Sequence, residues 1–256
     1  MLKPNEASSL SIDYPVRETR PPAPARVVSD PNPSWKRALD VTCILLTLPI
    51  TLPIGVVIAI FIKLVSPGPA FFRQQRIGVN GRKFMCLKFR TMKVNADTSV
   101  HQAHLKTLMT SNRPTRKLDC AGDKRLIFGG LLLRSLGVDE LPQLINVLRG
   151  EMSLVGPRPC TPYEYDLYLP RHKRRCEAPP GLTGLWQVSG KNKTTFEEQI
   201  DLDLYYVDHK SLWFDMKIIL LTIPAILALV WEMKTRSPMT PAAPAESSSN
   251  NVSLKQ

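Results

Sequence analysis

The chain has 256 residues, with 34 Lys and Arg against 22 Asp and Glu, and therefore a formal net charge of +12. Apolar residues make up 43% of the sequence, which is enough to build a folded core and argues against a wholly disordered chain. The five cysteines form no Cys-x-x-Cys pair, so the sequence argues against a disulfide scaffold and a zinc ribbon and favours a reducing compartment.

The positive charge is confined to the middle of the chain. Residues 1–34 carry four basic and four acidic side chains, and residues 237–256 carry one of each. Residues 63–125 carry fourteen Lys or Arg against three Asp, a local balance of +11. Such a segment predicts a partner with phosphate groups, such as nucleic acid, anionic lipid or a nucleotide. The alternative is a basic surface that faces only solvent.

The first 34 residues are rich in proline, lack an apolar period and are predicted to be a disordered tail. Between Asp40 and Lys63 lie 22 consecutive uncharged residues, Val41 to Ile62, which are enough to span a bilayer as one helix. However, Pro49 and Pro53 interrupt the middle of this segment, and both of its flanks are basic.

The positive-inside rule cannot hold for both flanks of a spanning helix. We therefore predict a re-entrant membrane helix over residues 35–66, broken at Pro49 and Pro53, that enters and leaves on the cytoplasmic side. Thr47 and Thr51 are expected to bond the backbone carbonyls freed at this break. A kinked spanning helix is the alternative.

The rest of the chain predicts short helices around a small β element. Strands are predicted over residues 70–76 and 83–90, joined by a turn at 78–81, which would place Lys88 and Arg90 on one face. The other predicted elements are a weak helix at 98–118, helices at 128–136, 141–148 and 195–209, and a strand at 153–155. Residues 218–231 form an apolar run interrupted by Pro224, either a core helix or a helix in the membrane interface.

Asp139 and Glu140 are the first candidates for chemistry. Pro142 is tolerated only in a first helical turn, so both carboxylates are expected near a helix N-terminus, where the dipole favours their ionised form. An ionised Asp beside cations can act as a nucleophile toward phosphorus. The alternative is that Asp139 is only an N-cap.

Two loops are candidates for binding. In Gly156-Pro157-Arg158-Pro159, two prolines restrict the backbone around one arginine, a residue suited to phosphate. The glycines between Pro180 and Asn192 permit close approach of a ligand, but the segment matches neither a Walker A loop nor G-x-G-x-x-G. The four histidines show no metal-ligand spacing.

Together, these motifs resemble those of bacterial sugar transferases that are monotopic polyprenyl-phosphate phosphoglycosyl transferases of exopolysaccharide, capsule and O-antigen assembly. The chain resembles their small, minimal form, from about Trp35 to about Trp231. The matching segments are Lys36–Asp40, Lys88–Met92, Leu133–Arg134, Asp139–Leu144, Asn146–Pro159, Pro180–Val188 and Leu202–Val207.

The resemblance implies an α+β membrane-associated fold. We expect a re-entrant N-terminal membrane helix hairpin and a mostly helical cytoplasmic catalytic domain with a small β element and interfacial amphipathic helices. The catalytic domain would cover residues 67–217, an interfacial or core helix 218–236, and a second disordered tail 237–256. The protein would lie on the inner (cytoplasmic) membrane, monotopic and facing the cytoplasm.

The resemblance also implies a reaction. Asp139 would attack the β-phosphate of a UDP-sugar, release UMP and carry a covalent phosphosugar, which polyprenyl (undecaprenyl) phosphate would then accept. Glu140 would assist, and Mg²⁺ at Asp139 and Glu140 would neutralise phosphate charge. The residues expected to bind substrate or line the site are Lys88, Arg90, Arg134, Arg158, Gln187 and Asp203.

The partners expected are therefore a UDP-sugar, polyprenyl phosphate and inner-membrane lipid, with no nucleic acid. The sugar, the glycan pathway and the oligomeric state, including a homodimer, stay open. Two other functions are weighed against this one: a membrane-tethered basic module that only binds polyanions, and a glycosyltransferase that moves the sugar alone and releases UDP.

Overall fold

The computed structural model describes residues 30–94, 125–189 and 194–235. The predicted tails, apart from residues 30–34, and the weak helix predicted at 98–118 lie outside these ranges. In chain order the elements are α1 (Ser34–Val65), β1 (Phe71–Ile77), the 3-10 turn η1 (Val79–Gly81), β2 (Lys83–Phe89), α3 (Gly130–Ser135), the 3-10 turn η2 (Val138–Glu140), α4 (Gln143–Leu148), β3 (Ser153–Val155), α5 (Pro162–Leu167), α6 (Pro170–Lys173), the 3-10 turn η3 (Arg174–Glu177), β4 (Gly181–Thr183), α7 (Leu185–Val188), α8 (Phe196–His209) and α9 (Leu212–Thr235).

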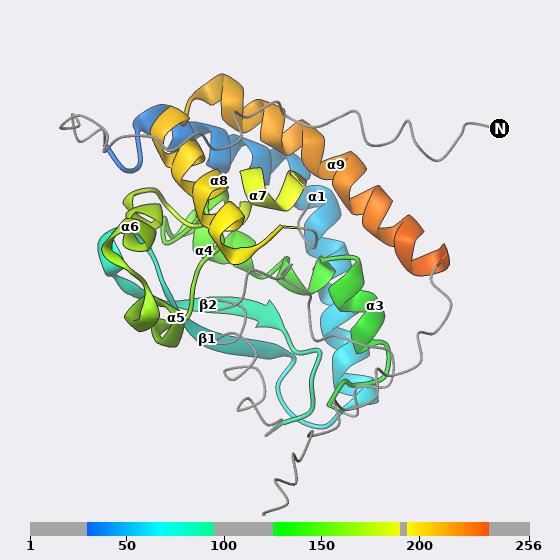
Figure 1. Ribbon diagram of the computed structural model, residues 1–256. Helices are drawn as coiled ribbons and strands as arrows, with labels where there is room; N and C mark the ends of the chain where they lie inside the picture. The colour runs from blue at the N-terminus through cyan, green and yellow to red at the C-terminus, as the bar shows by residue number, and fades with distance from the viewer. Residues whose placement is uncertain (1–29, 95–124, 190–193, 236–256) are drawn as a thin grey trace, which may run out of the picture.

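Most of these elements are short helices, and the sheets are small. Figure 1 shows β1 and β2 as a twisted ribbon beside the lower half of α1, with α7, α8 and α9 on the opposite side of α4. This arrangement confirms the predicted mixture of helices with a small β element. The helix predicted at 128–136 is shorter and begins at Gly130, and the helix predicted at 141–148 begins at Gln143 after the turn η2.

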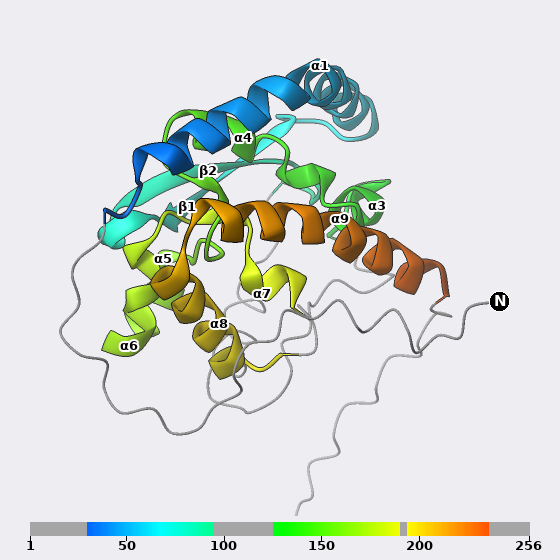
Figure 2. The ribbon, with the colours of Figure 1, turned by 90° about the horizontal axis from the view of Figure 1, so that it is seen from above.

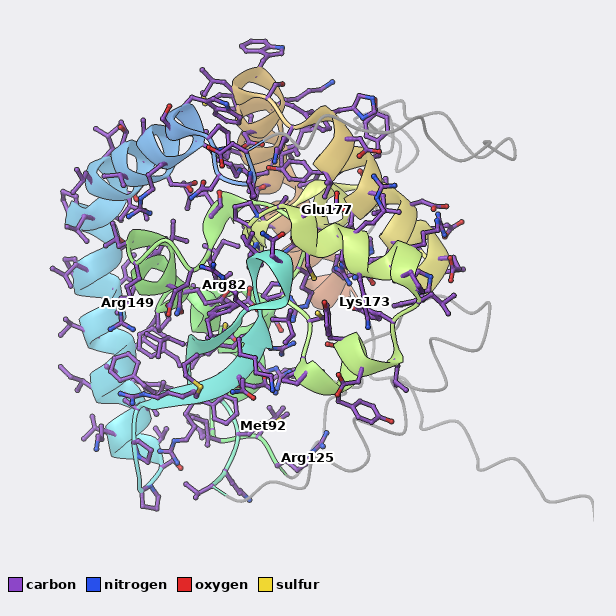
Figure 3. The ribbon with its side chains drawn as sticks, turned by 90° about the vertical axis from the view of Figure 1, so that its left-hand side faces the viewer. Arg82, Met92, Arg125, Arg149, Lys173 and Glu177 are labelled. Carbon is purple, nitrogen blue, oxygen red and sulfur yellow. The ribbon has the colours of Figure 1, made fainter. Side chains whose placement is uncertain are left out.

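The 32 residues of α1 form one continuous helix that contains both Pro49 and Pro53. The helix changes direction near its middle (Figures 1 and 3). Thr47 Oγ1 donates to the Cys43 carbonyl at 2.8 Å, and Thr51 Oγ1 donates to the Thr47 carbonyl at 3.1 Å. These are not the carbonyls that the prolines leave without a helical donor, which belong to residues 45 and 49. The expectation for the two threonines is therefore wrong in detail, although such back-bonding itself bends helices.

The N-terminal half of α1 is fastened to the folded domain through buried polar groups. Lys36 is fully buried, and its Nζ lies 2.5 Å from Asp215 Oδ2 and donates to the Val155 carbonyl at 2.8 Å and to Tyr206 Oη at 2.9 Å. Asp40 accepts from the Leu154 amide at 2.9 Å. The start of α1 is thereby tied to β3, α8 and α9.

The C-terminal half of α1 packs on the same folded domain through apolar side chains. Ile58 and Ile62 are buried in a cluster that contains Phe89 and Leu133, whereas Ile44 is buried in a second cluster nearer the N-terminus. The apolar side chains between these anchors are exposed: Leu45, Leu46, Leu48, Ile50, Leu52, Ile54, Val56 and Val57. Among the described residues, α1 is the one helix long and apolar enough to cross a membrane, judged by length and composition.

The predicted strands are confirmed as the antiparallel pair β1–β2. The register places Gln74 opposite Cys86 and Phe72 opposite Lys88. Gly81 in the connecting turn has a φ of +78°, and a Cβ there would come within 2.9 Å of Tyr165 Oη. The turn at 78–81 therefore needs glycine for both its backbone conformation and its packing.

A second, parallel pair brings two distant loops together. Ser153 of β3 pairs with Gly181 of β4. The loop that follows β3 lies against the start of β4, where the Gly181 amide donates to the Pro157 carbonyl at 2.9 Å. A Cβ on Gly156 would come within 2.1 Å of the Pro179 carbonyl, so the two backbones touch at this point. The main core lies next to this pair and joins β3, α7, α8 and α9.

The last two helices differ in how they are placed. The helix predicted at 195–209 is confirmed as α8, which begins at a capping box between Thr195 and Glu198. The apolar run predicted at 218–231 belongs to the longer helix α9, which packs against α7 (Figure 2). Ile218 of α9 is fully buried, whereas Leu220 and Ile223 are exposed. One side of the helix therefore packs in the core, and the other side exposes apolar side chains.

Candidate active site

The two adjacent carboxylates lie in η2, the tight turn between α3 and α4. Gly137 enters this turn with a φ of +71°, and Pro142 stands at the N-cap position of α4. Asp139 therefore occupies neither N-cap position, which removes the alternative that it is only a cap. Asp139 is 8% exposed, and Glu140 is more accessible. The sequence correctly predicts both carboxylates just before the helix.

Glu140 is surrounded by cations from two other segments. Lys88 Nζ of β2 donates to Glu140 Oε1 at 2.6 Å. Arg158 Nη1, from the loop after β3, lies 3.7 Å from the same oxygen. Lys88 lies 52 positions before Glu140 and Arg158 lies 18 positions after it, so three separate motifs meet at one carboxylate. The phosphate-binding roles expected for Lys88 and Arg158 stay predictions.

A hollow in the surface opens beside this carboxylate. It is lined by Arg76, Cys86, Lys88, Glu140, Gln143, Arg158, Pro159 and Gly181. Three of these side chains are cationic and one is a carboxylate. Burial, reinforced by the nearby charge of Arg158, lowers the pKa of Arg76. The excess of positive charge in a partly enclosed space favours an anionic ligand such as a phosphate.

Arg76 and Gln143 are site residues that the sequence interpretation missed. Arg76 is on β1, and its Nη1 donates to the Pro159 carbonyl at 3.0 Å. Opposite residues of an antiparallel pair share a face, so the turn at 78–81 together with Lys88 would have placed Arg76 on the Lys88 face. Gln143 is buried in the first turn of α4, next to the motif that carries the carboxylates.

Arg90 does not share the surroundings of Lys88. The strand β2 ends at Phe89, and the Arg90 guanidinium is buried at the C-terminal end of α1. Its Nη1 donates to the Pro67 carbonyl at 2.8 Å and its Nη2 to the Ser66 carbonyl at 2.9 Å. The expected common face of Lys88 and Arg90 is therefore wrong, because the strand stops between them.

Asp203 lies behind the hollow rather than in its lining. It is buried on α8, and its Oδ2 is 2.5 Å from Arg175 Nη2. Arg175 in turn donates to the carbonyl of Arg158 at 3.1 Å. Burial, opposed by the charge of Arg175, raises the pKa of Asp203 to about 6. Asp203 is thus linked to the lining residue Arg158 through one intermediary, Arg175.

The other two predicted substrate-binding residues, Gln187 and Arg134, lie on elements outside the lining of the hollow. Gln187 is on α7, where its Nε2 donates to the Leu182 carbonyl at 3.0 Å. Arg134 lies in the last turn of α3, partly exposed and five positions before Asp139. Neither residue belongs to the described residues that line the hollow.

A magnesium ion fits this donor set only with help from a substrate. Among residues 30–94, 125–189 and 194–235, no group of three His, Cys, Asp or Glu side chains could hold a metal ion. Mg²⁺ commonly binds through one or two carboxylates together with substrate phosphates. Glu140 lines a hollow suited to phosphate, and Asp139 precedes it in η2 without belonging to the described lining residues. The adjacent pair matches that mode of binding.

Comparison with known proteins identifies the family. The family model for bacterial sugar transferases matches residues 31–229, which include α1, both carboxylates and every residue that lines the hollow. The chain is a bacterial sugar transferase by family. The match covers far more than half of the sequence and confirms the resemblance.

Several curated relatives share this bacterial sugar transferase region. The exopolysaccharide production protein ExoY of Sinorhizobium fredii is 42% identical over 194 residues, which cover 75% of this chain and 84% of the relative. The UDP-glucose:undecaprenyl-phosphate glucose-1-phosphate transferase of Caulobacter vibrioides is 42% identical over 201 residues, 75% of this chain and 69% of the relative. The undecaprenyl-phosphate galactose phosphotransferase of Salmonella typhimurium is 37% identical over 199 residues, 75% of this chain but only 40% of the relative.

Proposed function

We propose that the protein transfers a sugar-1-phosphate from a UDP-sugar to undecaprenyl phosphate and releases UMP, as the first membrane step of exopolysaccharide or related glycan assembly. The observation that carries this proposal is the cationic hollow of Arg76, Lys88 and Arg158, which Glu140 of η2 also lines. Asp139 is the residue before Glu140 in the same turn. The names of relatives that transfer glucose-1-phosphate or galactose phosphate to undecaprenyl phosphate support it.

In the proposed reaction, a carboxylate oxygen of Asp139 attacks the β-phosphorus of the UDP-sugar. A new P–O bond forms to Asp139, the bond from the β-phosphorus to the oxygen that bridges the α-phosphate breaks, and UMP departs with that oxygen. A phosphate oxygen of undecaprenyl phosphate then attacks the same phosphorus. The bond to Asp139 breaks, which restores the carboxylate and leaves a lipid diphosphate sugar.

The surrounding residues would supply charge and orientation. Lys88 and Arg158 would neutralise the phosphate oxygens, with Arg76 at the inner side of the hollow. Lys88 also holds Glu140 in place beside Asp139. Mg²⁺ bound by Asp139 and Glu140 would neutralise additional negative charge on the diphosphate.

The shape of α1 supports a monotopic placement on the inner membrane, with the catalytic domain in the cytoplasm. A straight helix of 32 residues would be about 48 Å long, more than the hydrocarbon thickness of a bilayer. Here both ends of the helix pack against one folded domain, and the exposed apolar side chains lie between them. We propose that this middle part dips into the bilayer and that both ends stay on the cytoplasmic side.

The identity of the released nucleotide tests the reaction. Membranes or detergent-solubilised protein are incubated with undecaprenyl phosphate and a panel of UDP-sugars, and the nucleotides are separated by chromatography. We expect UMP from at least one sugar and no UMP after Asp139→Asn. The matched control is Asp166→Asn on α5, an exposed carboxylate that should leave turnover unchanged. Release of UDP alone would contradict the proposal.

A second measurement tests the covalent intermediate directly. Without the lipid acceptor, a phosphosugar on Asp139 can still react with UMP and reform the UDP-sugar. Labelled UMP should therefore enter the UDP-sugar pool in the absence of undecaprenyl phosphate, and Asp139→Asn should abolish this exchange. Turnover in the complete reaction without any such exchange would favour direct transfer in a single step.

A further inference from the structure

The loop that carries Arg158 is fixed by hydrogen bonds that its backbone carbonyls accept from other segments. Pro157 and Pro159 have no N–H group, which leaves the loop few donors of its own. Four consecutive carbonyls each accept a hydrogen bond from another segment: Pro157 from the Gly181 amide at 2.9 Å, Arg158 from Arg175 Nη2 at 3.1 Å, Pro159 from Arg76 Nη1 at 3.0 Å, and Cys160 from the Ile77 amide at 2.9 Å. The peptide planes on both sides of Arg158 are thereby fixed.

Arg175 is the donor to Arg158 itself, and it lies deep in the structure. It is 3% exposed. Its Nη1 donates to Tyr168 Oη at 2.7 Å, while its Nη2 contacts both the Arg158 carbonyl and Asp203. One planar guanidinium therefore joins three segments of the chain, a geometry that the single ammonium of lysine cannot reproduce.

The side chain of Arg158 needs such support because burial does not hold it. It is 31% exposed, and its Nη1 is 3.7 Å from Glu140 Oε1, too far for a hydrogen bond. Pro159 restricts the Arg158 backbone to extended conformations. Within that range, the direction of the Arg158 carbonyl determines where its side chain leaves the loop, and Arg175 is the group that holds this carbonyl.

We propose that Arg175, held by Asp203, is a positioning residue that directs Arg158 toward the diphosphate of the substrate. This inference rests on the proposed function, which gives Arg158 that ligand. Arg175 itself lies behind the loop and is not among the described residues that line the hollow. Small displacements of a group that orients a substrate lower the rate strongly, so the effect is measurable in turnover.

The test is a double-mutant cycle between this buried pair and Arg158. The combined change Arg175→Met with Asp203→Asn removes both charges together and leaves no buried ion without its partner. We expect kcat/KM for UMP release by the full chain to fall by roughly 10-fold or more. When Arg158 is already Lys, the same change should lower kcat/KM by less than roughly two-fold, because the group being positioned has been replaced.

A matched control separates positioning from general destabilisation. The pair Lys36 and Asp215 is equally buried and joins other elements. Lys36→Met with Asp215→Asn should change kcat/KM by the same factor whether residue 158 is Arg or Lys. An equal factor in both backgrounds for the Arg175 and Asp203 change would overturn the inference, whereas the proposed function would stand if UMP release still required Asp139.

A milder variant decides the question if the paired change prevents folding. Arg175→Lys keeps the charge opposite Asp203 but loses the fork that also reaches the Arg158 carbonyl. Thermal unfolding in detergent reports whether the variant is folded. The loss of kcat/KM caused by Arg175→Lys should be larger with Arg158 present than with Arg158→Lys, and losses of equal size would count against positioning.

Discussion

Arg76 and Arg73 lie three residues apart on β1 and therefore point to opposite faces of the hairpin. Arg76 lines the hollow, whereas Arg73 is exposed. We predict that Arg76→Gln raises the KM for the UDP-sugar by roughly 10-fold or more, because a charge-assisted contact to phosphate is lost. Arg73→Gln should change KM by less than roughly two-fold. Steady-state UMP release at varied UDP-sugar measures both, and equal effects would remove Arg76 from the binding site.

Asp203 gives a prediction about stability and pH. Burial raises the pKa of Asp203 from 3.8 to about 6 in the folded protein, so the folded state binds this proton more tightly than the unfolded state does. The stabilisation that protonated Asp203 provides is full below pH 4 and is lost as the pH rises through about 6. Relative to Asp203→Asn, the wild-type protein should therefore lose up to about 3 kcal/mol between these values and then stay level.

Thermal unfolding in detergent at several pH values between 4 and 8 measures this difference. The Asn variant cancels the contributions of all other titrating groups. A difference that grows in favour of the wild-type protein as the pH rises would mean that Arg175 outweighs the burial of Asp203, and that the pKa of Asp203 lies below its ordinary value.

At the scale of the element, α1 must satisfy two anchors at once. In the first turn of α1, Lys36 bonds to Tyr206 of α8 and Asp215 of α9. Near the end of α1, Ile62 packs against the β1–β2 hairpin and α3. A helix without the bend at Pro49 and Pro53 would be straight, and its ends could not both reach one domain. In the proposed monotopic placement, the two prolines therefore determine on which side of the membrane each end of α1 lies.

We predict that Pro49→Ala with Pro53→Ala shifts the N-terminus across the membrane. In the wild-type protein, tags at both ends of the chain should be digested by protease in inverted inner-membrane vesicles and protected in intact spheroplasts. In the double variant, a fraction of the N-terminal tag should show the opposite pattern, because alanine favours a straight helix by about 3 kcal/mol at each position.

The control for this experiment is Pro224→Ala, which removes a proline from α9 instead. It should leave the accessibility of both tags unchanged. If the wild-type N-terminal tag were digested in spheroplasts, α1 would cross the bilayer and the monotopic placement would be wrong.

At the scale of the whole molecule, features set by neighbours in the chain could be predicted from the sequence. The turn at 78–81, the strands beside it and the start of α8 depend on glycine, alternation and capping within a few residues. The place of Asp139 and Glu140 just before a helix follows from Pro142 in the same way.

Features that depend on distant contacts could not be predicted in this way. The sequence pattern treats Arg90 and Lys88 as equivalent. Because β2 ends at Phe89, however, Lys88 lines the hollow, whereas Arg90 donates to the Pro67 carbonyl just after the end of α1. Asp203 is a residue type that often occurs in active sites, but in the fold it pairs with the buried Arg175 instead. Arg175 lies 28 positions earlier in the chain, so this pair could not be predicted from neighbouring residues. Arg76 is different, because the predicted turn at 78–81 fixes the register that places it on the Lys88 face, and its signal was present in the sequence.

The proposed return of α1 to the membrane face from which it starts bears on what happens to the product. An enzyme anchored in this way would take up a soluble nucleotide sugar and leave the new sugar head group on the same side of the bilayer, still attached to its lipid. Nothing in such an anchor provides a polar route through the hydrocarbon, where an exposed diphosphate sugar would be strongly disfavoured. A glycan destined for the cell exterior would therefore require a separate protein to carry the lipid-linked sugar across the membrane.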